Sequence, residues 1–165
     1  MDVRQLSPGE QLIGVSGVAL FGVSFLDWVG ARITTLTIHG RSQSLPSSAY
    51  RFSDNAWAHP ATFLAVLIGV LMLGYVALRL VGLEPPRSAV TGRILAGLGL
   101  LALVLVIGQL LAGPHVDLAA FGLPSSANLG GVHISFVKTR SPGAYAGLVA
   151  TAGLAGGGYL VLRGR

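Results

Sequence analysis

Four long apolar runs, separated by polar segments, dominate the sequence. They cover residues 12–29, 61–81, 94–111 and 142–162. The second run carries no charge before Arg79, and at about 1.5 Å rise per residue a helix of this length crosses the ~30 Å hydrocarbon layer of a bilayer. We therefore expect an all-α membrane protein in which four transmembrane helices form a bundle, with residues 1–165 making a single membrane domain.

The first apolar run also allows a second interpretation. Its uncharged part, residues 12–26, has the length of the apolar region of a signal peptide, and residues 29–31 loosely resemble a cleavage site. However, only Arg4 supplies positive charge before this run, and Asp27 and Trp28 stand where small neutral residues would be expected. We favour a retained membrane span over a cleaved signal.

Two polar segments, residues 31–59 and 113–140, are expected to form loops on the outer side of the membrane. Within them, residues 32–38 are rich in β-branched side chains and residues 132–137 alternate between apolar and polar types. A lone strand would leave its backbone groups unpaired, so we expect the two to pair as a small β-ribbon over the outer ends of the helices. Residues 53–58 are expected to form one helical turn that presents Trp57 to the membrane interface.

Arginine and lysine near the ends of the spans predict the orientation. One side holds Arg4, Arg79, Arg87, Arg93, Arg163 and Arg165, and the other holds Arg32, Arg41, Arg51, Lys138 and Arg140. The first side is much shorter, so its density of positive charge is higher, which places both termini in the cytoplasm of a multi-pass plasma-membrane protein. Aromatic residues fit both interfaces, with Trp28, Trp57 and Tyr145 on the outside and Tyr159 on the inside.

Composition supports the bilayer as the main environment. The chain is 52% hydrophobic and 10% charged, whereas soluble domains carry about 25% charged residues. The absence of cysteine excludes a disulfide framework, a thiolate metal site and CxxC redox chemistry. We attribute the net charge of +5 to arginines that flank membrane helices, and not to nucleic-acid binding.

Small residues spaced along two of the runs are candidates for close helix packing. In lipid, glycine and alanine promote helix association because they let two backbones approach. Two interpretations fit: packing inside the bundle, which we favour, and an assembly face for a membrane-protein partner or a second copy. The candidate residues are Ala61, Ala65, Gly69, Gly143, Gly147, Gly153 and Gly157.

Asp27 and Gln109 form a candidate functional polar pair. Each lies ~22 Å from the inner end of its predicted span, so both should sit near the outer boundary of the hydrocarbon layer. A carboxylate within a membrane suggests ion or proton handling. Near the interface, however, it reaches water or Arg32 at little cost, and we favour an anchor or an interhelical hydrogen bond.

No motif specifies an enzyme, a metal site or a cofactor. The outer side gathers His39, His59, His115, His133, Asp27, Asp54 and Asp117, but their spacing matches no metal-binding pattern such as HExxH. There is no GxSxG motif, and the three glycines at residues 156–158 lack the lysine of a phosphate loop. We therefore expect no catalytic residues, no metal and no cofactor.

Three motifs together resemble a known kind of protein. FLDW at residues 25–28 closes the first span, DNAW at residues 54–57 precedes the second, and GAYAGLVATAGLAGGGYLVLR at residues 143–163 forms the last. This combination resembles uncharacterised small four-span integral membrane proteins of high-GC Gram-positive bacteria, and it implies a plasma-membrane four-helix bundle without established catalytic residues. The layout also resembles that of claudins, although the cysteine pair and the GLW signature of their first loop are absent.

Two functions follow from these features. The first is a non-catalytic membrane subunit or scaffold whose outer loops contact another protein or an envelope component. The alternative is a small transporter or channel component that uses Asp27 and Gln109. A sealed apolar interior would favour the first, and a continuous polar path would favour the second. An enzyme that acts on lipid is a more distant third interpretation.

Overall fold

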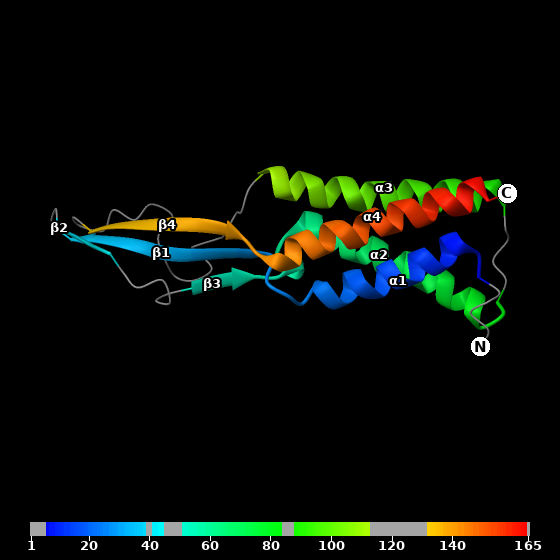
Figure 1. Cartoon of the computed structure of the whole chain (residues 1–165), viewed down its shortest axis with the longest axis horizontal. Coiled ribbons are helices and arrows are strands. Elements are labelled where there is room, and N and C mark those ends of the chain that lie inside the picture. The colour runs from blue at the N-terminus through cyan, green and yellow to red at the C-terminus, as the bar shows by residue number, and fades with distance from the viewer. Residues whose placement is uncertain (1–5, 39–40, 45–50, 84–87, 113–131, 165) are drawn as a thin grey trace.

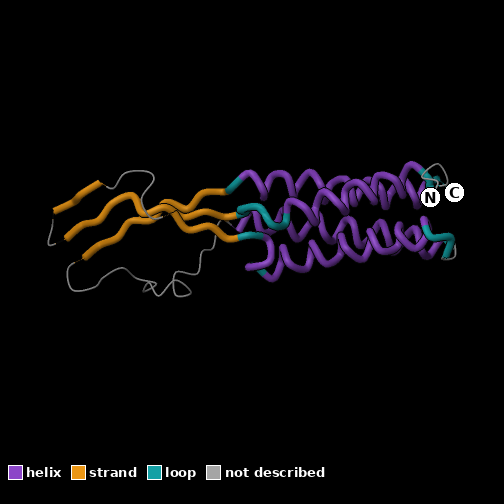
Figure 2. The backbone as a smooth tube through the Cα atoms, turned by 90° about the horizontal axis from the view of Figure 1, so that it is seen from below, coloured by secondary structure: helices purple, strands orange, loops and turns teal. Residues whose placement is uncertain are grey.

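Four helices lie side by side at one end of the molecule, and a β-sheet extends from them along the long axis (Figures 1 and 2). The structure, a computed structural model, describes residues 6–38, 41–44, 51–83, 88–112 and 132–164. The beginning of α1 and the end of α4 both lie at the end of the helices that is farthest from the sheet. The elements in chain order are α1 Pro8–Val23, β1 Val29–Ile38, β2 Arg41–Ser44, β3 Arg51–Asp54, the 3₁₀ turn η2 Ala56–Ala58, α2 Pro60–Leu80, α3 Ala89–Ala112, β4 Val132–Arg140 and α4 Pro142–Arg163.

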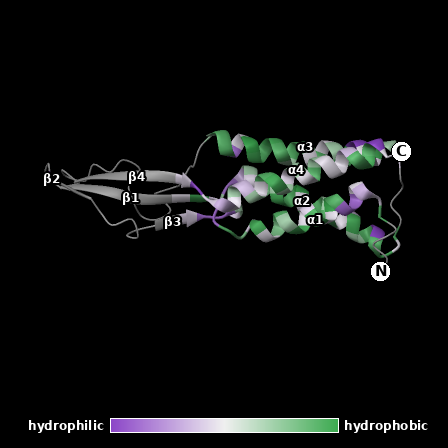
Figure 3. Cartoon of the chain, viewed as in Figure 1, coloured by the Kyte–Doolittle hydropathy of each residue, from purple (hydrophilic) through white to green (hydrophobic). Residues whose placement is uncertain are grey.

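Three of the helices are long and apolar enough to cross a membrane. The most apolar stretches of α2, α3 and α4 have mean hydropathies of 2.4, 2.6 and 1.4, and apolar residues follow these helices along their length (Figure 3). This is the character expected of a membrane protein. Helix α1 has 16 residues, which corresponds to about 24 Å.

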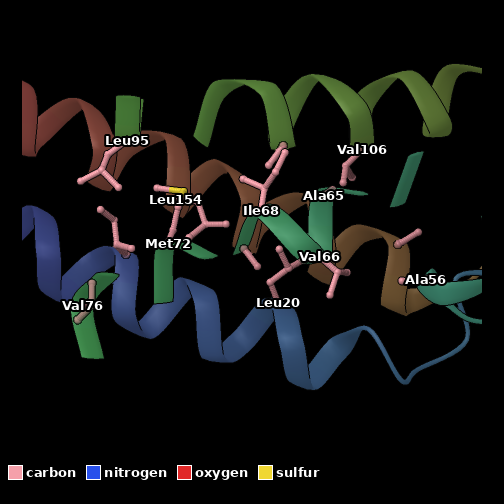
Figure 4. Close-up of a cluster of buried hydrophobic side chains, with 14 of the residues drawn as sticks. Leu20, Ala56, Ala65, Val66, Ile68, Met72, Val76, Leu95, Val106 and Leu154 are labelled. Atoms are coloured by element: carbon pink, nitrogen blue, oxygen red, sulfur yellow. The ribbon is translucent and has the colours of Figure 1, made fainter. Parts of the chain in front are cut away.

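The helices bury a shared apolar core, with α1 packed on α2 and α4, and α3 packed on the same two helices. Leu20 of α1, Met72 of α2 and Leu154 of α4 are almost completely buried there (Figure 4). The opposite faces are also apolar, since Val15 is 71% exposed and Val149 is 73% exposed. A helix that is apolar on all sides suits a lipid surrounding.

Glycines set the closest approaches between helices. A Cβ atom at Gly158 would lie 2.6 Å from the Leu95 carbonyl oxygen, and one at Gly99 would lie 2.7 Å from the Leu154 carbonyl oxygen, so α3 and α4 are in backbone contact there. Between α1 and α4, a Cβ at Gly9 would lie 2.7 Å from the Gly157 carbonyl oxygen. This contact by small residues is the mode of association typical of membrane helices.

The sheet is antiparallel and is built around β1. Strand β4 pairs along one edge of β1, while β3 and β2 pair with the beginning and the end of its other edge. The predicted pairing of the two outer segments is confirmed, with Leu36 opposite Ile134 and Ile38 opposite Val132. Strands β2 and β3 are additions to the two-stranded ribbon expected from the sequence.

The sequence had suggested that the β-structure covers the outer ends of the helices, and this was wrong. The sheet continues away from the helix ends (Figures 1 and 2). The reason is the shortness of the connections. Strand β4 passes into α4 through Ser141 alone, and five residues join α1 to β1. The strands therefore continue roughly in the direction of the helices, and β1, with 10 residues, is ~33 Å long.

The prediction of one helix over residues 12–29 was wrong. Helix α1 ends at Val23, and β1 begins at Val29, so the first apolar run belongs to two elements. Ser24 caps the end of the helix: its backbone N–H donates to the Leu20 carbonyl, and its hydroxyl donates to the Phe21 carbonyl at 2.6 Å.

The other helices begin or end close to the predicted positions. Helix α2 differs from its predicted span by one residue at each end, and α4 by one residue at its end. Helix α3 begins five residues before its predicted start, because Ser88 precedes it and accepts a hydrogen bond from the Thr91 N–H at 3.1 Å.

Candidate functional site

Trp28 connects the helices to the sheet. It is 2% exposed. Its backbone N–H donates to the Asp54 carbonyl of β3 at 2.8 Å, and its carbonyl accepts from the N–H of Ser141, which precedes α4, at 3.1 Å. Its indole N–H donates to the Val23 carbonyl at the end of α1, also at 2.8 Å. One residue immediately before β1 therefore holds α1, β3 and α4 together.

Two glycines of α4 make room for the Trp28 indole. A Cβ atom at Gly147 would overlap the ring, and one at Gly143 would lie 3.0 Å from its Cδ1 atom. Both glycines were candidates for packing between helices. The structure places them against the indole, so the ring lies directly on the first two turns of α4.

A second group of hydrogen bonds joins α1 to α2 through η2. Ala56, at the start of η2, donates its N–H to the Ser24 carbonyl at 3.2 Å, and its carbonyl accepts from the Thr62 hydroxyl at 2.6 Å. Asn55 caps the turn by accepting from the Trp57 N–H at 3.1 Å. Ala56 and Ser24 are completely buried, and Thr62 is 1% exposed. The connection from the sheet to α2 is therefore also held by hydrogen bonds between buried residues.

A small cavity lies beside Trp28 at the meeting point of these elements. Its volume is about 20 Å³, enough for one water molecule. Gln109 lines it, and so does His59, whose Nε2 atom is buried without a hydrogen-bond partner in the described part of the chain. The remaining lining residues are Trp28, Val29, Thr62, Val106, Leu110, Arg140 and Ala144.

The structure does not bring Asp27 and Gln109 together at this cavity. Asp27 lies beyond the end of α1, is exposed, and is not among the residues that line the cavity, whereas Gln109 is half-buried and does line it. Asp27 meets α4 through its backbone, since its carbonyl oxygen lies against Gly143. Asp27 is therefore exposed beside α4 while Gln109 lines the cavity, and their role as a functional pair stays a prediction.

Arg140, the last residue of β4, binds the end of α3. Its guanidinium donates to the Leu110 carbonyl in the last turn of that helix. A positive charge at a helix C-terminus is stabilising because the carbonyl ends of the helix carry partial negative charge. Together with Trp28 and η2, this contact means that each of the four helices is tied to the junction.

An aromatic cluster covers the outside of the junction. The Phe21 and Phe25 rings lie edge to face with centroids 5.2 Å apart, and Trp57 stands between Phe25 and Phe63 at 5.8 Å from each. Phe21, Phe25 and Phe63 are 44%, 59% and 42% exposed. The exposed rings lie where the apolar helices meet the polar sheet, which is where aromatic residues gather in membrane proteins.

The opposite end of the helices holds a buried ion pair that sequence reasoning missed. Arg79 Nε of α2 lies 3.0 Å from Glu10 Oε1 of α1, and the two side chains are 5% and 3% exposed. The Tyr75 hydroxyl donates to the same oxygen at 3.5 Å, and the Ser7 N–H donates to Glu10 Oε2 at 2.8 Å. The spacing of Ser7 and Glu10 is that of a capping box, which was the available signal in the sequence.

The remaining small-residue candidates lie between helices of this chain. Ala65 is completely buried, and Gly69 would place a Cβ 2.8 Å from Leu20 of α1. Gly153 faces Ser16 of α1, and Gly157 faces Gly9. Ala61 is half-buried at the start of α2. These positions agree with the favoured interpretation, which is packing inside the molecule.

The outer histidines give no described metal site. His39, His115 and Asp117 lie outside the described residues, and the side chain of His133 on β4 is not described. In the described ranges no group of three His, Cys, Asp or Glu residues could hold a metal ion. His59 is the histidine whose surroundings the structure defines, and it lies at the cavity beside Trp28.

Comparison of the chain with protein-family models, with curated proteins and with solved structures found no match. The resemblance to small four-span membrane proteins, which came from the FLDW and DNAW motifs and the sequence of the last span, therefore stays a prediction.

Proposed function

We propose that the protein is a four-span plasma-membrane protein with both termini in the cytoplasm, and that it acts as a non-catalytic subunit or scaffold. In this role it holds its β-sheet outside the membrane in contact with a partner protein or an envelope component. The observation that carries the proposal is the direct attachment of the sheet to all four helices around Trp28. A sheet fixed in this way has a constant height and direction relative to the membrane.

The packing of α1 on α4 supports the fourth span. The two helices run antiparallel, with Ser16 against Gly153 and Gly9 against Gly157. The turn after α1 reaches Gly143, close to the first residue of α4. Helix α1 and this turn together thus extend over nearly the same length along the helix axes as α4. Helix α4 is long enough to cross a membrane by itself.

Charge supports the proposed orientation. Arg93 near the beginning of α3 and Arg163 at the end of α4 are exposed, and both lie at the end of the helices away from the sheet. Arginine close to the ends of membrane helices favours the cytoplasmic side. This arrangement puts the sheet on the outer side of the membrane.

The sheet offers edges to which a partner could bind. Among the described strands, β4 pairs with β1 alone, and β2 and β3 pair with β1 alone. Unpaired edge groups of a sheet bind extended segments of other proteins through main-chain hydrogen bonds. The proposed scaffold would use these edges, with the helices serving as its anchor.

The alternative, a transporter or channel component, receives less support from the interior. The core side chains are mostly apolar. The buried hydroxyls of Thr62 and Thr151 donate to backbone carbonyls within their own part of the chain, so they do not line an open path. Asp27 is exposed outside the cavity that Gln109 lines. A packed apolar interior favours the scaffold.

Site-specific photo-crosslinking in native membranes tests the scaffold. A photoreactive amino acid at Ser53, which is exposed on β3, should form a defined adduct with a partner, because the sheet is the proposed contact surface. The same group at Leu83, which is 61% exposed beyond the opposite end of α2, is the matched control and should not form this adduct. Adducts that are equal at both positions, or absent at Ser53, would contradict the proposal.

A further inference from the structure

The basic residues of the sheet gather at the end that is next to the helices. The described strands contain five lysine or arginine residues and one acidic residue, Asp54. Four of the five basic residues lie in register with the first four residues of β1, from Val29 to Arg32. They are Arg32 itself, Arg51 opposite Arg32, Lys138 opposite Ala31, and Arg140 opposite Val29. The fifth, Arg41, is opposite Ile38, the last residue of β1, about 30 Å from the first.

The register places these four residues on both faces of the sheet. Successive residues of a strand belong to opposite faces, and residues directly opposite in neighbouring strands share a face. Arg32 and Arg51 are directly opposite each other and therefore share one face. Lys138 pairs with Ala31, which precedes Arg32, so Lys138 and Arg140, two residues further along β4, share the other face. Positive charge thus surrounds this end of the sheet, and we call these four residues the basic collar.

Two residues of the basic collar repel each other within the sheet. Arg32 and Arg51 are direct cross-strand partners, and like charges at such positions destabilise a pair of strands. Asp54 is opposite Val29, so it lies on the face of Arg140 and not on the face of Arg32. In the described strands the face of Arg32 and Arg51 therefore has no acidic residue that compensates the repulsion. An anion from outside the sheet would supply this compensation.

The basic collar lies at the height of the lipid headgroups if the helices cross a bilayer. The strands continue from the helix ends roughly in the direction of the helices, so position along β1 measures height (Figures 1 and 2). The exposed rings of Phe21, Phe25 and Phe63 mark the boundary of the apolar part at the junction. From Val29 to Arg32 the height rises by about 10 Å. The headgroup layer is about 5–7 Å thick, and charges act over about 8 Å at physiological ionic strength.

We propose that the basic collar binds anionic phospholipid headgroups of the leaflet next to the sheet. The site rests on the proposed function, since the helices must cross the bilayer, but either orientation of the protein satisfies it. Positive charge at one height on both faces matches a planar anionic surface, whereas an acidic partner protein would meet one face or one edge. Arginine is also well suited to phosphate, because its guanidinium can donate two parallel hydrogen bonds. The headgroups would lie against the faces of the sheet, and the proposed partner would use its edges.

Quenching of a fluorophore by labelled lipids tests the proposal. The chain has no cysteine, so Ser53→Cys carries a single bimane group; Ser53 is exposed and pairs with Gly30 at the height of the collar. The full chain is reconstituted in phosphatidylcholine vesicles that contain a small fraction of nitroxide-labelled phosphatidylglycerol or of phosphatidylcholine with the same acyl-chain label. The measured quantity is the ratio of quenching by the anionic lipid to quenching by the zwitterionic lipid. Bimane at Leu83→Cys gives the same ratio for the opposite end of the helices.

The ratio at Ser53 should exceed one when the collar is intact, and it should depend on the collar alone. Arg32→Ser with Lys138→Ser removes one charge from each face. Because each basic residue near an anionic membrane surface strengthens the attraction about fivefold, this double variant should lower the ratio at Ser53 by at least about twofold. Arg41→Ser, which removes a charge from the far end of the same sheet, is the control and should leave the ratio unchanged. The ratio at Leu83 should change in neither variant.

A ratio of one at Ser53 with the collar intact, or a ratio that the double variant does not lower, would overturn the lipid site. An equal decrease in Arg41→Ser would also overturn it, because the effect would then follow the net charge of the sheet. If the double variant does not fold, about 0.5 M NaCl provides a second test: screening should bring the ratio at Ser53 towards one, and a ratio insensitive to salt would overturn the site. Absence of quenching by both lipids at Ser53 and Leu83 would contradict the membrane-spanning helices of the proposed function, whereas quenching without preference contradicts the lipid site alone.

Discussion

At the scale of the residue, Trp28 shows how a side chain can be singled out from the sequence while its contacts are not. Its position after an apolar run is typical of an aromatic residue at the membrane interface, and this stays a prediction. The structure adds that the ring is buried within the protein, because two glycines one turn apart on α4 leave room for it and the Val23 carbonyl accepts its indole N–H. The N–H of a buried indole usually has such a hydrogen-bond partner. Neither the glycine contact nor the partner can be seen in the local sequence.

The first prediction concerns the contact between Trp28 and Gly147. Trp28→Ala removes a fully buried ring and should lower the free energy of unfolding by about 3–5 kcal/mol. Gly147→Ala should also destabilise, by about 1–3 kcal/mol, because its methyl group would overlap the indole. Thermal unfolding in detergent, followed by circular dichroism, measures both changes.

The double variant tests whether the two effects share one cause. With Trp28 already replaced by alanine, Gly147→Ala has no ring to displace and should cost little further stability. Gly97→Ala, where a Cβ meets nothing within 4 Å, serves as the control and should leave stability unchanged or slightly raised. If the losses of unfolding free energy in the two single variants simply add in the double variant, overlap of the alanine methyl group with the indole does not explain the loss in Gly147→Ala.

At the scale of the element, apolar length and helix-start signals predicted α2 and α4 to within one residue at each end. Proline at the first position of both helices explains this accuracy. The boundary of α1 was missed, because an apolar run alone does not show where a helix gives way to a strand. The pairing of β1 with β4 was predicted from alternation, whereas β2 and β3 have polar sequences whose pairing depends on β1 being in place.

The second prediction concerns the ion pair that joins α1 to α2. Glu10→Gln leaves the Arg79 charge buried without its carboxylate, and Arg79→Met leaves the Glu10 charge buried without its guanidinium. Each single change should lower the free energy of unfolding by about 3–5 kcal/mol. The side chains are 5% and 3% exposed, so solvent screens the interaction little. Chemical unfolding of the three variants, two single and one double, measures the coupling.

The double variant Glu10→Gln with Arg79→Met should be more stable than either single variant, because it also removes the charge that each single change leaves without its counterpart in the ion pair. Arg93→Met is a suitable control, since Arg93 is exposed on α3. A double variant whose loss equals the sum of the single losses would show that the ion pair does not couple α1 to α2. Substitution of Ser7 would weaken only the cap of α1 and should cost about 0.5–2 kcal/mol.

At the scale of the whole molecule, the sequence predicted helices in a membrane with a small β-structure outside it, but it did not predict the long shape. The shape depends on how the sheet joins the helices. That junction uses Trp28 just before β1, Ser141 in the connection to α4, and the turn η2, which come from distant parts of the chain. Local patterns cannot reveal such a meeting point, whereas the apolar character of α2, α3 and α4 is local and was therefore visible.

The third prediction is the topology, which decides whether the sheet lies outside the cell. The chain has no cysteine, so a single introduced cysteine reports on one position. Ser53→Cys on β3 and Leu83→Cys after α2 are both exposed in the structure and lie at opposite ends of the helices. In intact cells a membrane-impermeant maleimide should label Ser53→Cys and should leave Leu83→Cys unlabelled.

Permeabilised cells supply the control, because both cysteines should then react to a similar extent. Gly164→Cys, immediately after α4, should behave like Leu83→Cys if α4 crosses the membrane back to the side on which α2 ends. Labelling of Leu83→Cys and Gly164→Cys but not Ser53→Cys in intact cells would place the sheet in the cytoplasm. The inverted result would keep the packing of the four helices and the sheet unchanged, but it would remove the outer partner from the proposed function.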